Sequence, residues 1–205
     1  MSHYPEDIEA RLQTAAPSGI NYSSDTDPHG VTYAWCELAS KDELKSVGET
    51  LARLGARLSL ITGSQTPPPP EVDDEDEAEG EAEAKPVPMT FGGTPMDGTA
   101  YEITYHFDLL GDTLTLVVYA PQGSSIDSLT SLFRTADWPE REIMETYNLR
   151  IDNHPDPRRL FLDKSIEPAV MERLIPFSTL TNATSTTALW EKVMDAAKIT
   201  KGGES

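Results

Sequence analysis

The residues best equipped for chemistry lie between Asp137 and Asp163. This stretch, DWPEREIMETYNLRIDNHPDPRRLFLD, holds four arginines, seven carboxylates and one histidine among aromatic and aliphatic side chains. Such a mixture serves three purposes in proteins: an active site, a metal site, or a surface that fits another protein.

Catalysis and metal binding both depend on the single histidine of the stretch. A general acid–base site would combine His154 with Asp152 or Asp156, but the only thiol, Cys36, falls in an expected buried strand, and no serine stands in a nucleophile elbow. A metal site from the same three side chains has one imidazole and no His or Cys companion at a characteristic spacing. We therefore expect no catalytic, cofactor-binding or metal-binding residue in this chain.

A protein interface fits the composition better. Arginines among aromatics are enriched where proteins bind one another, because the planar guanidinium both stacks and forms paired hydrogen bonds with carboxylates. The intramolecular alternative has Asp137 paired with Arg141 along one helix, and Arg158 and Arg159 paired with helix carboxylates to fasten the tail. Spacing alone leaves both interpretations open, and they are compatible because a fastened tail is a preorganised docking surface. The helix carboxylates in question are Glu140, Glu142 and Glu145.

Charge excludes some classes of partner. The 205 residues carry a formal net charge of -19, so nucleic acid and anionic membrane surfaces would repel the chain. No apolar run approaches the roughly 18 residues of a membrane span, and Met1 to Ala15 lacks the pattern of a signal peptide, so we expect a cytoplasmic protein without direct membrane insertion. The single cysteine cannot hold an iron–sulfur cluster, which needs about four ligands.

About half of the net charge sits in one insert, residues 67–88. Four consecutive prolines precede nine carboxylates between Glu71 and Glu83, with no base among them. Such a segment buries too little apolar surface to offset its ordering entropy, which predicts a disordered, solvated insert. The functional alternative is a free-standing acidic adaptor in which Asp73 to Glu83 is the working part.

Hydrophobic periodicity predicts the elements before the insert. Gly30 to Leu38 alternates with apolar residues on both sides and is expected to be a well-buried strand. Ser40 and Glu43 form a capping-box pattern before a helix of about 14 residues that Gly55 ends, and Ala56 to Thr62 is a second strand. A helix from about Pro5 to Ala15 precedes them.

The elements after the insert complete the fold class. Tyr101 to Leu109 and Thr113 to Pro121 alternate strictly around a Gly-Asp turn, which predicts a β-hairpin. Residues 124–137 have the spacing of a helix with Ile126, Leu129, Leu132 and Phe133 inward. The order predicts an α+β fold, a β-α-β-β-α sheet domain with helices on one face followed by an extended C-terminal tail. We assign residues 1–66 and 89–148 to the domain and 149–205 to a partner-docking tail.

The charged stretch itself divides into a helix and part of that tail. Asp137 with Glu140 is a second capping pattern, Pro139 is tolerated in the first turn, and the helix is expected to reach about Tyr147 with Asn148 as a left-handed cap. Two prolines make the following residues extended. Further along, Ala188 to Ile199 has helical spacing.

The charged stretch resembles the signature of the thirty-kilodalton subunit family of respiratory-chain NADH dehydrogenase, shared with the equivalent small subunit of membrane-bound, energy-converting [NiFe] hydrogenases. In that family a Trp-x-Glu-Arg-Glu helix leads to His-Pro-x-x-Arg-Arg-Ile/Leu and an acidic residue. The matching residues here, in order and spacing, are Trp138, Glu140, Arg141, Glu142, Tyr147, His154, Pro155, Arg158, Arg159, Leu160 and Asp163.

The chain also departs from the family pattern. Glu145 stands where the family commonly has Asp, Thr146 where it has Met, and Asn148 where it has Gly, while Ile151 and Asn153 replace an aromatic residue and a Gly. From Lys164 onward the Tyr-Gly-Phe-x-Gly-His-Pro-type extension of the quinone-reducing enzyme is missing. The departures favour the hydrogenase branch, with the corresponding subunit in NADH-quinone oxidoreductase as the alternative.

The resemblance implies a non-catalytic subunit of a membrane-associated electron-transfer complex, one that binds no cofactor itself. It would dock onto the large catalytic subunit of a [NiFe] hydrogenase, or its equivalent of the forty-nine-kilodalton type, beside iron–sulfur subunits on the inner face of the cell membrane. The complex would couple electron transfer to ion translocation. The resemblance further implies that the signature charges hold the tail and meet the partner, and that His154 with Pro155 sets the turn.

Overall fold

A mixed five-stranded sheet is the centre of the computed structural model, which describes residues 3–67, 87–147 and 149–165. Its strands are β1 (Ile20–Thr26), β2 (Thr32–Leu38), β3 (Arg57–Gln65), β4 (Ala100–Leu109) and β5 (Asp112–Pro121), in the order β1-β2-β5-β4-β3. β2 and β5 run parallel, and the other neighbours run antiparallel. Most of the acidic insert, the predicted Asn148 cap and the predicted helix Ala188 to Ile199 lie outside the described residues.

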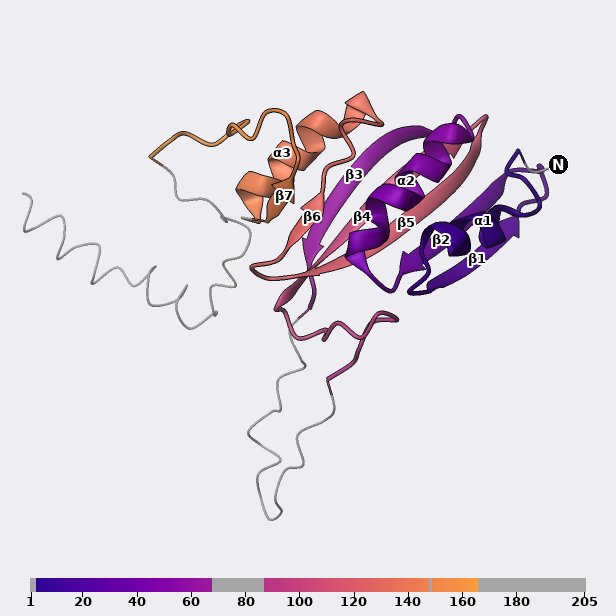
Figure 1. Cartoon of the computed structure of the whole chain (residues 1–205), viewed down its shortest axis with the longest axis horizontal. Helices are drawn as coiled ribbons and strands as arrows, with labels where there is room; N and C mark the ends of the chain where they lie inside the picture. Colours follow the sequence, from indigo (N-terminus) through magenta and orange to yellow (C-terminus); the bar gives the residue numbers. More distant parts are fainter. Residues whose placement is uncertain (1–2, 68–86, 148, 166–205) are drawn as a thin grey trace, which may run out of the picture. The chain divides into compact units, whose positions relative to one another are not determined.

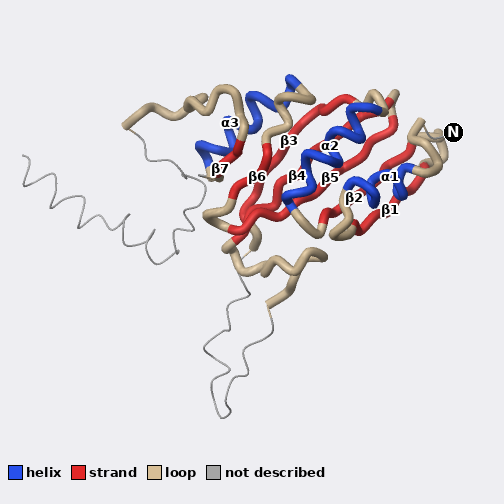
Figure 2. The backbone as a smooth tube through the Cα atoms, in the orientation of Figure 1, coloured by secondary structure: helices blue, strands red, loops and turns tan. Residues whose placement is uncertain are grey.

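The helices cover one face of this sheet, as the sequence predicted for an α+β fold. α1 (Ile8–Ala15) and α2 (Leu44–Arg53) lie in front of the sheet in Figure 1, and α3 (Asp137–Thr146) packs beside β3. Figure 2 shows the strands of the main sheet as one layer behind α1 and α2. A short parallel pair, β6 (Ser125–Asp127) with β7 (Arg150–Asp152), brings the start of the tail back to the domain.

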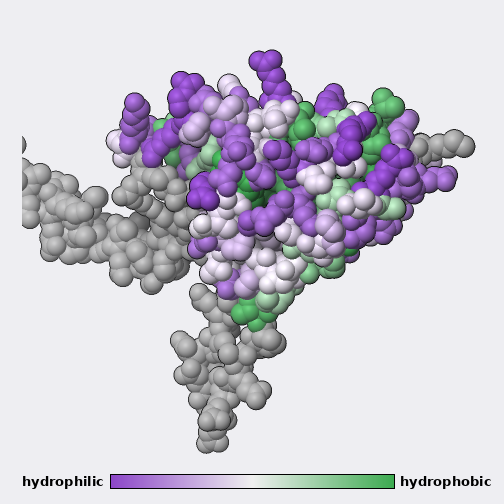
Figure 3. Space-filling view, viewed as in Figure 1, coloured by the Kyte–Doolittle hydropathy of each residue, from purple (hydrophilic) through white to green (hydrophobic). Residues whose placement is uncertain are grey.

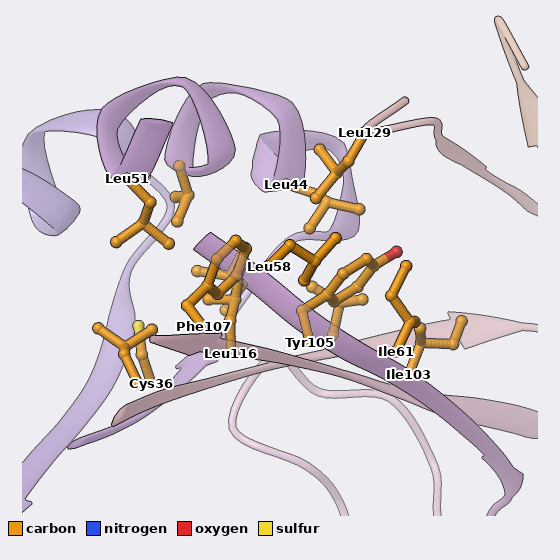
Figure 4. Close-up of a cluster of buried hydrophobic side chains, with 14 of the residues drawn as sticks. Cys36, Leu44, Leu51, Leu58, Ile61, Ile103, Tyr105, Phe107, Leu116 and Leu129 are labelled. Atoms are coloured by element: carbon orange, nitrogen blue, oxygen red, sulfur yellow. The ribbon is translucent and has the colours of Figure 1, made fainter. Parts of the chain in front are cut away.

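The core lies between the helices and the sheet. Leu44 and Leu51 of α2 point down onto Phe107, Tyr105 and Leu116 of the sheet (Figure 4), all of them buried. Cys36 also points into this layer, and burial raises the pKa of its thiol to about 12. The helix-bearing side of the molecule presents a mostly hydrophilic surface (Figure 3).

The first half of the chain differs from expectation in three places. β1 was not predicted, because its sequence INYSSDT is polar and shows no alternation. β2 is buried on one side only, since Tyr33 is 52% exposed and Trp35 45% exposed. The capping box before α2 is half made: Ser40 Oγ accepts from Asp42 N, but Glu43 accepts from Ser18 N instead of completing the box.

The predicted helix over residues 124–137 was wrong. The segment forms β6, turns and a short 3-10 helix, η3 (Arg134–Ala136), although the apolar residues expected to face inward are buried or partly buried. Its backbone finds partners elsewhere, because β6 pairs with β7 and Ser128 N donates to Asp152 O at 2.9 Å. Tertiary pairing therefore overrides the local helical spacing. The predicted elements that the structure confirms are α1, β2 as a strand, α2, β3, the β4–β5 hairpin and α3.

Candidate functional site

Helix α3 holds the tail through two side chains one turn apart, Arg141 and Glu145. Arg141 Nε donates to the carbonyl oxygen of Arg158 at 2.9 Å and Nη2 donates to that of Arg159 at 3.1 Å. Glu145 accepts from the backbone N–H groups of Leu160 and Phe161, each at 2.8 Å. We call this arrangement the tail clamp. It fixes the path of the main chain from residue 158 to 161, because a charged side chain holds each end.

The contacts between helix and tail differ from those expected in the intramolecular alternative. There the tail arginines were to reach the helix carboxylates, whereas in the structure the helix side chains bind the tail backbone. Arg158 makes a bidentate ion pair with Asp156, both distances being 2.7 Å. These hydrogen bonds hold the pKa of the Asp156 carboxyl well below its usual range. Arg159 donates to the carbonyl oxygen of Asp163 at 2.8 Å.

The expected pair between Asp137 and Arg141 is not formed in the described part of the chain. Arg141 has its ion-pair partner in Asp156, with Nη1 to Oδ2 at 3.7 Å. Asp137 is also not a cap, because it is the first residue of α3 and Ala136 stands at the N-cap position without a side-chain bond.

The side chain of Glu140, in the first turn of α3, is buried with His154 beside it. The Glu140 side chain accepts from Ser128 Oγ at 2.6 Å and from Leu129 N at 2.8 Å. Burial raises the pKa of the Glu140 carboxyl to about 7, although these two hydrogen bonds favour its ionised form. Glu140 thus joins α3 to the turn after β6 instead of closing a capping box.

His154 packs against Glu140 from the tail side. Its side chain has no exposed surface, and Nε2 lies 3.8 Å from Glu140 Oε2. Nδ1 accepts from Asp156 N at 3.1 Å, so Nε2 is the donor to the carbonyl oxygen of Asp137 at 3.2 Å. The imidazole therefore bridges the tail and the first residue of α3.

Tyr147 fastens the other end of α3 to the sheet. Its hydroxyl donates to the carbonyl oxygen of Gly63 on β3 at 3.0 Å, and its ring packs against Tyr101 with centroids 5.5 Å apart. A Cβ at Gly63 would lie 3.4 Å from the Tyr147 ring and 3.3 Å from Ile143. Helix and strand therefore approach closely here, and a side chain at this position would have to displace Ile143 or Tyr147 slightly.

The predicted site residues divide into an inner and an outer set. The inner set, with buried or half-buried side chains, consists of Glu140, Arg141, Tyr147 and His154. Arg159 is also half-buried, through its place beside the tail clamp. The outer set is exposed and consists of Trp138, Glu142, Pro155, Arg158 and Asp163. Trp138 is 62% exposed and the Arg158 side chain 82% exposed.

Sequence reasoning missed the role of one residue of this site. Glu145 was noted only as a departure and as a possible partner for the tail arginines, yet it is buried and binds the tail backbone. Its spacing of four residues from Arg141 was the available signal, since such residues share a helix face. Phe161, 65% exposed at the end of the tail clamp, extends the outer set.

The structure does not gather the candidate catalytic or metal-binding trio. Asp152 accepts from Ser125 Oγ at 2.6 Å, and Asp156 pairs with Arg158, while His154 lies beneath α3. Among the residues that are described, no three His, Cys, Asp or Glu side chains are grouped to hold a metal ion. No helix in that part of the chain is both long and apolar enough to span a membrane.

The family follows from the sequence match around this site. The model of the family described as "Respiratory-chain NADH dehydrogenase, 30 Kd subunit" matches residues 40–179, which include α2, the sheet from β3 onward, α3 and the tail clamp. The chain belongs to this family.

Two individual members of this family share limited sequence identity with the chain. A subunit from the NADH-quinone oxidoreductase of Caulobacter vibrioides is 27% identical over 109 residues, covering 52% of this chain and 55% of that protein. The equivalent protein of Phenylobacterium zucineum, named in the same way, is 34% identical over 67 residues, 31% of each chain. The chain thus spans about half the length of the first curated relative that it matches, and less of the second.

Two solved structures are similar to the chain. A trypsin-resistant fragment of Nqo5 aligns with 73% of this chain and 98% of its own, with a TM-score of 0.44 and 18% identity. A membrane-bound sulfane sulfur reductase, described as an archaeal respiratory membrane complex, aligns with 78% of each chain at a TM-score of 0.42 and 11% identity.

Proposed function

We propose that this chain is a cofactor-free structural subunit of a membrane-associated electron-transfer complex and that it docks onto the large catalytic subunit. The observation that carries the proposal is the tail clamp. Arg141 and Glu145 direct their charges to the tail backbone, which leaves the side chains of Arg158 and Phe161 exposed on a fixed path. A docking surface gains affinity when its backbone is ordered before binding.

The composition of the outer set supports a protein partner. Exposed Trp138 and Phe161 offer flat apolar area, and the Arg158 guanidinium is already oriented by Asp156. Tryptophan and arginine are among the side chains most enriched at positions that dominate binding energy. Family membership supports a partner of this class, since relatives of this chain are named as subunits of NADH-quinone oxidoreductase.

The full proposal places the chain in an assembly. The partner would be a large subunit of the forty-nine-kilodalton type or of the [NiFe] hydrogenase type, next to iron–sulfur subunits, peripheral on the inner face of the cell membrane. Residues 149–205 would lie along this partner. The inner set would act as the frame: Glu140 and His154 hold the tail from below, and Arg141 holds it from the helix side.

Two branches of this proposal have separate support. The names of the relatives favour the NADH-quinone branch. The missing extension after Lys164 and the replacement of the family's Gly by Asn148 favour energy-converting [NiFe] hydrogenase, in which electrons pass from ferredoxin or a similar donor to protons. Metal and flavin content of the purified complex separates the two.

The test is a pair of substitutions on the outer side of the tail clamp. Arg158→Ala with Arg159→Ala removes two guanidinium groups from the tail while leaving Arg141 and Glu145 in place. We expect recovery of intact complex to fall at least about tenfold, as for loss of charged hydrogen-bonding groups at an interface. The measurement is the yield of large subunit that co-purifies from native membranes.

The matched control is Arg11→Ala with Arg53→Ala. These arginines lie on α1 and α2, away from the tail, and their removal changes the net charge by the same amount. We expect wild-type recovery of the complex from this control. Wild-type recovery from the Arg158 and Arg159 variant as well would contradict docking through the tail, and the tail clamp would then be an internal brace only.

A further inference from the structure

The two edge strands of the sheet, β3 and β1, differ in how far other residues bind their backbone groups. At the β3 edge, Thr135 Oγ1 donates to the carbonyl oxygen of Leu58 at 2.9 Å, and Tyr147 binds that of Gly63. Side chains from η3 and the end of α3 thus occupy carbonyl groups of β3. At the opposite edge β1 is the last strand, and five of its seven residues are exposed. An exposed edge strand is a template for pairing with another chain.

Next to this edge stand two exposed aromatic side chains, Tyr33 and Trp35. Both point to the outer face, which is the face of the sheet opposite α1 and α2. Trp35 pairs across the sheet with Ser23 of β1 and Thr115 of β5, and Tyr33 has Asp25 and Thr113 as its neighbours. Because these neighbours are small or charged, they leave the rings uncovered.

The ribbon formed by β1 and β2 carries charge of one sign only. From Ile20 to Leu38 the sequence contains Asp25, Asp27 and Glu37 and no lysine or arginine. Asp27 uses its carboxylate in the turn between the strands, where it accepts from Val31 N at 2.9 Å. Asp25 stands on the outer face beside Tyr33. Aromatic faces together with carboxylates attract guanidinium and ammonium groups.

The aromatic surface continues beyond β2. Glu37 Oε1 accepts from the backbone N–H of Phe91 at 2.9 Å, and Phe91 is 50% exposed. The adjoining Gly92 lies so close to the end of β2 that a Cβ there would come within 2.2 Å of the carbonyl oxygen of Ala39. Glu37 and this glycine therefore fix the loop at the end of the strand, so the surface has a defined shape before any partner binds.

We propose that the β1 edge and the outer faces of Tyr33 and Trp35 bind a positively charged, extended segment of another protein. The segment would add a strand beside β1, about 10 Å from β2 at the usual strand spacing. Arginine side chains of the segment would reach across small Ser23 to stack on Trp35 and pair with Asp25. This surface lies on β1 and β2, separate from the tail clamp, and does not depend on the function proposed above.

A second copy of the chain fits this surface poorly. Antiparallel pairing of β1 with β1 would place two all-acidic ribbons side by side, which like-charge repulsion disfavours. A nucleic acid is repelled for the same reason. The charge pattern thus selects a basic polypeptide as the occupant.

The probe is a peptide of alternating arginine and valine, long enough to pair with all of β1, titrated into the full-length chain at low salt and followed by amide NMR shifts. We expect saturable shifts at the amides of β1 and at the indole N–H of Trp35, weakened at high salt. Trp35→Thr should lower the affinity about fivefold or more, and Asp25→Lys by a similar factor. Leu60→Thr, on β3 at the opposite edge, is the matched control and should change nothing.

Three outcomes would overturn the proposal. The first is that the peptide shifts only residues 71–83, equally in wild type and Trp35→Thr, because the acidic insert then binds it alone. The second is equal affinity for a peptide with glutamate in place of arginine. The third is a concentration-dependent dimer, without peptide, that Trp35→Thr abolishes, since the occupant would then be a second copy.

Discussion

Glu140 and His154 show what the sequence could predict at the scale of single residues. Both were placed in the candidate site by the resemblance to the family signature, and the structure places both at the junction of helix and tail. Their roles did not follow, because Glu140 was expected to cap the start of the helix, whereas in the first turn of α3 its carboxylate accepts from Ser128 and Leu129. The segment that contains Ser128 and Leu129 was predicted as a helix, so nothing in the sequence indicated this contact.

The buried Glu140 carboxyl predicts a pH dependence of stability. Its pKa is raised to about 7 in the folded chain and is about 4.3 when unfolded, so protonated Glu140 favours the folded state. This contribution is fully present below the unfolded pKa and is lost as pH rises through 7. Relative to Glu140→Gln, the free energy of unfolding should therefore fall by about 2 kcal/mol between about pH 5 and pH 8.

Urea unfolding of both proteins across this pH range measures the difference directly. The glutamine is neutral at every pH and keeps an oxygen for Leu129 N. Parallel curves for wild type and variant would mean that the Glu140 carboxyl titrates alike in the folded and unfolded chain.

The tail clamp predicts protection from trypsin. Arg141 binds the carbonyl groups of Arg158 and Arg159, which belong to the two peptide bonds that trypsin would cut. Removing these charged hydrogen bonds in Arg141→Ala should speed cleavage at those bonds about tenfold, while the sheet keeps its far-ultraviolet circular dichroism. Arg134→Ala, an exposed arginine on η3, is the control. Equal cleavage rates in all three proteins would show that Arg141 does not restrain the tail.

At the scale of elements, strict alternation was a reliable guide, and the two capping patterns located α2 and α3 although neither forms a complete capping box. The β4–β5 hairpin, α2 and α3 matched their patterns because each element has one apolar face against one core. β1 has no such face, and β6 depends on β7, which is more than twenty residues further along. Elements that depend on a distant backbone partner could not be read from local periodicity.

The hairpin turn carries a conformational strain that can be relieved. Leu110 has φ 54° and Gly111 has φ 103°, and the two residues connect β4 to β5. Both positions favour residues that tolerate positive φ, and Leu110 is 77% exposed, so its side chain contributes little packing. Leu110→Asn should raise the free energy of unfolding by about 0.5–1 kcal/mol, measured by urea denaturation.

Gly111→Ala tests the same turn in the opposite direction. An added Cβ would meet no atom within 4 Å, so any destabilisation comes from the backbone alone, and about 1 kcal/mol is expected. A destabilised Leu110→Asn variant would contradict the assigned turn conformation.

At the scale of the whole molecule, the acidic insert distinguishes the two candidate functions, because the free-standing adaptor would need it and the complex subunit would not. It interrupts the connection from β3 to β4, and the flanking backbone is held on both sides: Thr66 N donates to Ala100 O at 2.8 Å and Gln65 binds the carbonyl oxygen of Gly98. Replacing residues 68–86 by a short Gly-Ser linker should therefore leave the fold and the recovery of the complex unchanged. Loss of all partners on this replacement would favour the adaptor.

The most direct measurement is affinity purification of the full chain from its native membranes, with mass spectrometry and metal analysis of the proteins that accompany it. We expect a large subunit of the forty-nine-kilodalton or [NiFe] type in stoichiometric amount, with iron–sulfur partners. Nickel would identify the hydrogenase branch, and flavin with an NADH-oxidising module the respiratory branch. Recovery of the chain alone, from membranes in which it is intact, would contradict the central claim that this chain is a subunit of such a complex.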